Sequence, residues 1–166
     1  MLNARLYLAT AYASPYIPGA PSEQNQRLAR LAVADYKGVL ALEPENLSAI
    51  DAIGALLFQM AGTPFHPDQF LESKAYHQKH LLIRPDDPEP YYWIGVIDWT
   101  WSYRGNGELR RQHNRDMPGQ QISEVDPLPA DLRVVYLRDF GPLIDEGIAA
   151  LRHAISIRPD YDDAMA

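Results

Sequence analysis

Apolar residues recur three and four positions apart in successive stretches of the chain, and clusters of proline, glycine and polar residues separate these stretches. This spacing puts the apolar side chains on one face of an α-helix. It predicts helices over residues 2–13, from Ser22 to Pro44, from 46–48 to about 61, from 67 to about 83, from 88–90 to about 101, and from 143 to 158.

The segments between these helices carry the usual start and stop signals. Residues 14–21 hold three prolines and a glycine and therefore break the first helix. Ser22 is a suitable N-cap for the second helix, and either Asn46 or Ser48 for the third. Pro67 fits the first turn of the fourth helix. These signals predict short, defined connections.

The pattern lapses after residue 101. Residues 102–128 are polar and contain three glycines, so we predict a loop there, with one short helix at about 108–114. Residues 131–138 again favour a helix. Gly141 and Pro142 should interrupt it before the last amphipathic helix begins. Acidic residues at 160–163 predict the start of a further helix.

Three of the helices end in the same way, with apolar residues followed by a proline. The three segments are residues 39–44 (VLALEP), 80–85 (HLLIRP) and 154–159 (AISIRP). A helical unit that recurs along a chain is typical of a stacked helical array.

These units resemble the tetratricopeptide repeat (TPR) family, in which two antiparallel helices fill about 34 residues. The second helix of that unit carries a small residue, an aromatic residue, a second small residue, two apolar residues and a proline. The first copy matches this pattern with Ala32, Tyr36, Val39, Leu40, Leu42 and Pro44, and the last with Gly147, Leu151, Ala154, Ile155, Ile157 and Pro159. A weaker middle copy has Ser73, His77, His80, Leu81, Ile83 and Pro85.

First helices of the family carry a large residue and then an apolar–small pair. Ile50, Ile53 and Gly54 fit this pattern, as do Tyr91, Ile94 and Gly95. A glycine lets another helix approach closely, which offsets its helix-propensity cost of about 1 kcal/mol.

The resemblance implies an all-α fold, a right-handed α–α superhelix of about three helix pairs in a single domain, 1–166. The repeats would span 2–45, 46–86 and 87–160, with the start of a further helix at 161–166. Their spacing exceeds the family's unit, and the extra residues fall between the two helices of each repeat, at 14–25, 62–69 and 102–141. An unrelated helical bundle is the alternative.

Composition narrows the possible partners. The 166 residues carry a formal net charge of −7, which disfavours nucleic acid and anionic membranes as partners. No apolar run approaches the 18 to 20 or so residues of a membrane span. Cysteine is absent, which leaves the redox compartment undecided. The resemblance is to bacterial members of the family, some of them exported or lipid-anchored, so cytoplasm and periplasm both stay open.

Candidate catalytic and metal-binding residues are few. His77 and His80 share a helix face, but they fall on packing positions of the repeat and no HExxH pattern accompanies them. The acidic residues at 160–163 lack the glycine and the distal glutamate of a calcium loop. We therefore expect no enzyme, no metal and no cofactor; a metalloenzyme using the two histidines is the alternative.

The family binds peptides or helices in a groove lined by its first helices. Transferring those positions gives Asp51, Ala55, Phe58, Gln59, Tyr92, Val96, Trp99 and Thr100. The positions of the family's carboxylate clamp hold no lysine or asparagine here, so a chaperone-tail receptor is not expected. We expect a non-enzymatic scaffold for a protein or peptide partner. Two alternatives remain: the long insertion covers these aromatic residues, or the chain is a structural part of a longer solenoid.

Overall fold

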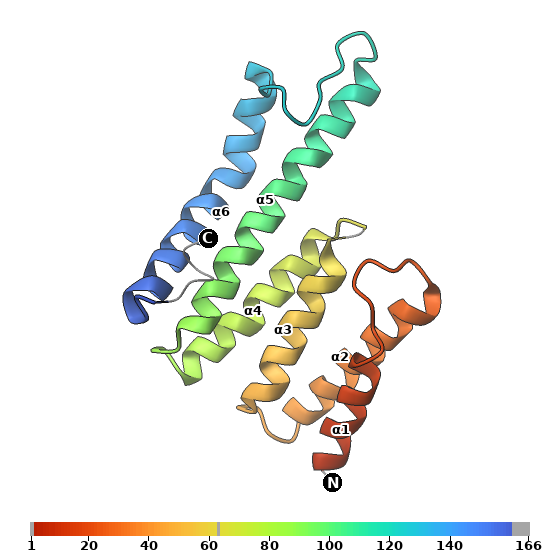
Figure 1. Cartoon of the computed structure of the whole chain (residues 1–166), viewed down its shortest axis with the longest axis vertical. Coiled ribbons are helices and arrows are strands. Elements are labelled where there is room, and N and C mark those ends of the chain that lie inside the picture. Colours follow the sequence, from red (N-terminus) through yellow and green to blue (C-terminus); the bar gives the residue numbers. More distant parts are fainter. Residues whose placement is uncertain (1, 63, 161–166) are drawn as a thin grey trace.

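Helices account for most of the chain. The computed structural model describes residues 2–62 and 64–160, and this part contains six α-helices and no strand (Figure 1). They are α1 (Leu2–Ala13), α2 (Glu23–Leu40), α3 (Leu47–Ala61), α4 (Pro67–Ile83), α5 (Pro88–Asp116) and α6 (Ala130–Ile157). The predicted all-α class is confirmed. The helix expected at 161–166 lies outside the described residues.

The helices pack in chain order as three antiparallel pairs. The most extensive contacts are within the pairs α1–α2, α3–α4 and α5–α6, and smaller ones join α2 to α3 and α4 to α5. Figure 1 shows these pairs side by side across the molecule, with the third pair markedly longer than the other two.

The predicted caps form at the helix starts. The side chain of Ser22 accepts a hydrogen bond from the backbone N–H of Asn25, and that of Asn46 accepts one from Ala49. Asn46 rather than Ser48 is therefore the cap of α3. Pro67 stands in the first turn of α4 as predicted, where its missing N–H leaves no bond unmade.

The connection between α1 and α2 is held by one buried amide. Asn25 accepts a bond from the N–H of Ile17 and donates to the carbonyls of Ile17 and Ala20. Gly19 has φ of +79°, a turn conformation that side chains disfavour. The proline-rich segment is thus folded onto the start of α2.

Two of the predicted close helix contacts are present. A Cβ at Gly54 of α3 would lie 2.7 Å from Nε2 of His77 on α4. One at Gly95 of α5 would lie 2.4 Å from Cγ of Leu151 on α6. Real Cβ atoms are not found this close to other atoms, so both positions need glycine, as the sequence predicted.

The prediction of a loop is wrong for residues 102–107 and 115–116, whereas the short helix expected at about 108–114 lies within α5. Helix α5 continues to Asp116, and only residues 117–129 lie outside helices. Gly105, expected to break the helix, is where the Phe140 ring of α6 packs on the α5 backbone, since a Cβ there would meet that ring at 2.1 Å. Side-chain bonds one turn apart, such as Arg110 to Asn106, support the rest of this polar segment.

The predicted break at Gly141 and Pro142 is also wrong. Helix α6 runs from Ala130 through Pro142 to Ile157. A proline in a helix removes one backbone hydrogen bond, but α6 is anchored on α5 on both sides of it. Phe140 lies against Gly105 before the proline, and Gly147 lies against Gly95 after it.

Candidate protein-binding surface

The four predicted groove residues on α3 differ in accessibility. Gln59 is exposed, whereas Asp51, Ala55 and Phe58 are half-buried. The Phe58 ring contacts Phe70 of α4 edge-on at 5.9 Å between centroids and Trp93 of α5 at 5.7 Å. Phe58 therefore joins α3 to α5 and offers only part of its ring to a ligand.

The four predicted residues on α5 lie on one stripe of the helix. Tyr92 is half-buried and packs with the apolar cluster around Ala154 of α6. Val96 and Thr100 are half-buried, and Trp99 is 64% exposed. The α3 and α5 sets meet where Phe58 contacts Trp93, the neighbour of Tyr92.

Trp99 forms a stacked pair with Tyr103 on the surface of α5. Their ring centroids are 5.6 Å apart and the planes differ by 9°, while Tyr103 is 56% exposed. Two large rings held together in solvent present apolar area at low entropic cost to a partner. Both rings stay exposed, although the segment 117–129 returns along the far ends of α5 and α6, away from α1 to α4 (Figure 1).

A buried ion cluster fixes α5 in place. The ammonium of Lys74 on α4 lies 2.8 Å and 2.9 Å from the two carboxylate oxygens of Asp98 on α5, and 2.8 Å from a carboxylate oxygen of Glu146 on α6. Asp98 is fully buried and Lys74 nearly so. The ammonium of Lys74 thus joins α4, α5 and α6. This contact fixes the rotation of α5, and with it the direction in which Trp99 faces.

Burial raises the pKa of the Asp98 carboxyl to about 6, and the hydrogen bond from Lys74 opposes this rise. The carboxylate is partly protonated only in mildly acidic solution. At neutral pH the Asp98 carboxyl is therefore mostly ionised.

The two histidines of α4 have different surroundings. His77 is 2% exposed, stacks on Trp93 at 5.7 Å, and its Nε2 has no hydrogen-bond partner. His80 is bound at Nδ1 by Asp51, 2.7 Å away, and its Nε2 lies 3.4 Å from a carboxylate oxygen of Asp87. Residues 2–62 and 64–160 contain no group of three or more His, Cys, Asp or Glu placed to hold a metal ion. The His77 ring fills the space between Gly54 of α3 and Trp93 of α5.

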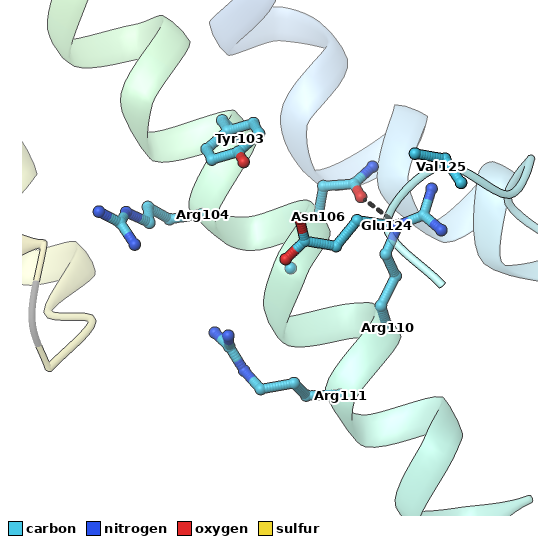
Figure 2. Close-up of a pocket in the computed structure, with 8 residues that line it drawn as sticks. Tyr103, Arg104, Asn106, Arg110, Arg111, Glu124 and Val125 are labelled. Carbon is cyan, nitrogen blue, oxygen red and sulfur yellow. Dashed lines mark hydrogen bonds between the residues drawn. The ribbon is translucent and has the colours of Figure 1, made fainter. Parts of the chain in front are cut away.

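A hollow of about 290 Å³ opens beside the aromatic pair, farther along α5 (Figure 2). Tyr103 lines it together with Arg104, Gly107, Arg110 and Arg111 of α5, and Glu124 reaches in from the segment 117–129. Arg104 and Arg111 extend to the same side of α5 in Figure 2, whereas Arg110 points toward the segment that carries Glu124.

These residues were not in the predicted set, although the sequence held a signal for them. Tyr103 and Gly107 continue the spacing of Tyr92, Val96 and Trp99 by three and four positions. The polar composition of residues 102–128 predicts a loop and so hides this signal. The helical structure of this segment depends on contacts with α6. One of them joins Gly105 to Phe140, which is 35 residues away in sequence.

Comparisons of this chain with protein-family models, curated proteins and solved structures give no significant match. Over the described ranges, none of the helices combines the length and apolar character that crossing a bilayer requires.

Proposed function

We propose that this protein is a non-enzymatic scaffold of the TPR-like superhelical type, which binds a peptide or a helix of a partner protein along the stripe of α5 that carries Trp99 and along the adjoining part of α3. The observation that carries the proposal is the stacked pair Trp99 and Tyr103, which remains exposed beside half-buried groove positions. Aromatic residues of this kind commonly anchor protein interfaces.

The order of the helices supports a repeat architecture. Three antiparallel pairs follow one another, and each of the second and third pairs has a glycine where its two helices touch. Stacked pairs of this type present the first helices of successive repeats on one face. Here those helices are α3 and α5, which carry the predicted groove residues.

Selection of peptides from a random phage-displayed library tests this function. Wild-type protein should enrich a defined set of peptides, and Trp99→Ala should no longer bind them. Tyr7→Ala is the matched control, because Tyr7 on α1 is an exposed aromatic residue away from the stripe, 76% accessible. Equal binding by all three proteins, or no enrichment by the wild type, would refute the proposed site.

A second candidate function is that of a structural unit in a longer helical array. Val134, Leu137 and Ile148 of α6 are exposed apolar residues on the outer helix of the third pair, and such residues commonly contact a further repeat. Changing all three to serine should abolish concentration-dependent association in light scattering, while Trp99→Ala should leave it intact. A protein that stays monomeric at all concentrations would argue against this role.

A further inference from the structure

The hollow beside Trp99 and Tyr103 is rich in arginine, although the chain as a whole is acidic. Three arginines and one glutamate line it, in a protein with a formal net charge of −7. Arg104, Arg110 and Arg111 therefore form a local positive patch. A negatively charged partner is attracted to this positive patch and is repelled by the acidic remainder of the surface. The patch would therefore direct such a partner to the hollow.

Arg104 is available to a ligand. No hydrogen bond or ion pair joins its guanidinium to another described residue, and its side chain is exposed. It extends toward the end of α3, where a Cβ at Gly62 would lie 3.8 Å from its Nη2. Arg111 is held by Glu108 of the preceding turn, and Arg110 by Asn106 and by the carbonyl of Ser123. The hollow is thus partly preorganised, and one of its guanidinium groups has no partner among residues 2–62 and 64–160.

The hollow already accommodates a carboxylate of the chain itself. Glu124 extends from the 117–129 segment across α5, between Asn106 and Arg111 (Figure 2). Two acidic neighbours raise the pKa of the Arg111 guanidinium, first Glu108 through its hydrogen bond and then Glu124 through its charge. No hydrogen bond fixes Glu124, and its side chain is exposed, so an incoming carboxylate can replace it.

From these observations we infer that the hollow binds an acidic peptide segment of a partner protein, one of whose carboxylates takes the place of Glu124 while a neighbouring side chain packs on Trp99 and Tyr103. This inference rests on the proposed scaffold function and names its ligand class. Arg104 and Arg111 are seven residues apart on the helix, a rise of about 10 Å. A peptide in the polyproline II conformation has three residues per turn and rises about 3.1 Å per residue, so acidic side chains three apart lie on one face, about 9 Å apart, and fit both arginines.

Fluorescence anisotropy with a labelled peptide of about a dozen residues tests the inference, at an ionic strength of about 0.15 M where distant charges are screened. The peptide repeats glutamate, leucine and serine, and its neutral copy has glutamine for glutamate. We expect binding of the acidic peptide only. Arg104→Ala should weaken it about tenfold, the effect of losing one charge-assisted hydrogen bond. Glu124→Gln should strengthen it by removing a competing carboxylate.

Arg152→Ala is the matched control, because Arg152 is an exposed arginine of α6 outside the hollow, and it should bind like the wild type. Circular dichroism melting of every variant separates lost binding from lost structure. Equal binding of the neutral copy, equal weakening by Arg152→Ala, or tighter binding to phosphatidylserine vesicles or to a phosphoserine peptide would each overturn the inference. If library peptides bind through Trp99 but the acidic peptide does not bind, the acidic ligand is wrong and the scaffold function stands.

Discussion

Gly95 of α5 and Gly147 of α6 face each other at the closest approach of the third helix pair. A Cβ at Gly95 would lie 3.1 Å from the carbonyl oxygen of Gly147, and one at Gly147 would lie 3.4 Å from that of Gly95. The backbones of the two helices are thus nearly in contact. This arrangement brings Asp98, one turn along α5, and Glu146 of α6 to the same ammonium group, that of Lys74.

Gly95→Ala should lower the free energy of unfolding by about 2 kcal/mol, because the added methyl group would overlap the Leu151 side chain and press on the α6 backbone. Gly107→Ala, in the same helix, is the control. Its methyl group meets only the end of Arg111, at 3.8 Å, so helix propensity should raise stability by about 0.5–1 kcal/mol. Urea unfolding measures both, and equal effects would show that the third pair is not packed this closely.

Lys74→Met should destabilise the fold by about 3–5 kcal/mol, since it leaves the carboxylate of Asp98 buried without a counter-charge. Lys79→Met on the same helix removes the same charge at a site without a buried carboxylate and should change stability by less than about 0.5 kcal/mol. Chemical unfolding at neutral pH measures the free energies of unfolding of the two variants, which can then be compared. Similar small losses would mean that the cluster is hydrated in solution.

His77 should make the protein less stable in acid. Burial, assisted by the charge of His80, lowers the pKa of His77 to about 4 from its ordinary 6.5. Between these values the unfolded chain binds the proton and the folded chain does not, so stability falls as the pH drops from about 6.5 to 4, by roughly 3 kcal/mol in all. His77→Leu should remove this part of the pH dependence, which unfolding curves at several pH values measure. An unchanged slope would refute the prediction.

Asp98 should have the opposite effect to His77, because its protonation should make the folded protein more stable as the pH falls. Its raised pKa of about 6 means that the folded state takes up the proton before the unfolded state does, so acidification from about pH 6 to 4 stabilises the fold. Asp98→Asn should therefore show a steeper loss of stability in acid than the wild type. A shallower loss would indicate that the carboxyl has a lowered pKa in the folded protein.

Trp99→Ala should leave the melting temperature within a few degrees of the wild type, because the ring is mostly exposed and stacks on another exposed ring, that of Tyr103. Phe70→Ala is the contrast, since the ring of Phe70 is fully buried between α3 and α5 and its loss should cost about 3–5 kcal/mol. Thermal melting by circular dichroism compares them. Unfolding of Trp99→Ala would make this residue part of the core and displace the proposed binding surface.

Local signals were sufficient for the first four helices. The caps at Ser22 and Asn46, the proline at 67 and the three-and-four spacing of apolar residues act within a few positions, and the structure agrees with them. Gly54 and Gly95 also indicated where helices touch. Glycine within a helix is unfavourable, and a close approach of another helix offsets that cost. The charge cluster was not predictable, since Lys74, Asp98 and Glu146 come from three helices and share no sequence spacing.

What the sequence by itself determined is the all-α class and the approximate extent of the first four helices, because both follow from periodicity and from local caps. Tertiary structure alone decided how far α5 and α6 extend. Gly105 and Pro142 disfavour a helix locally, yet the contact of Gly105 with Phe140 and that of Gly95 with Gly147 outweigh this preference. Those contacts carry α5 beyond Trp99, and with it the arginines that line the hollow.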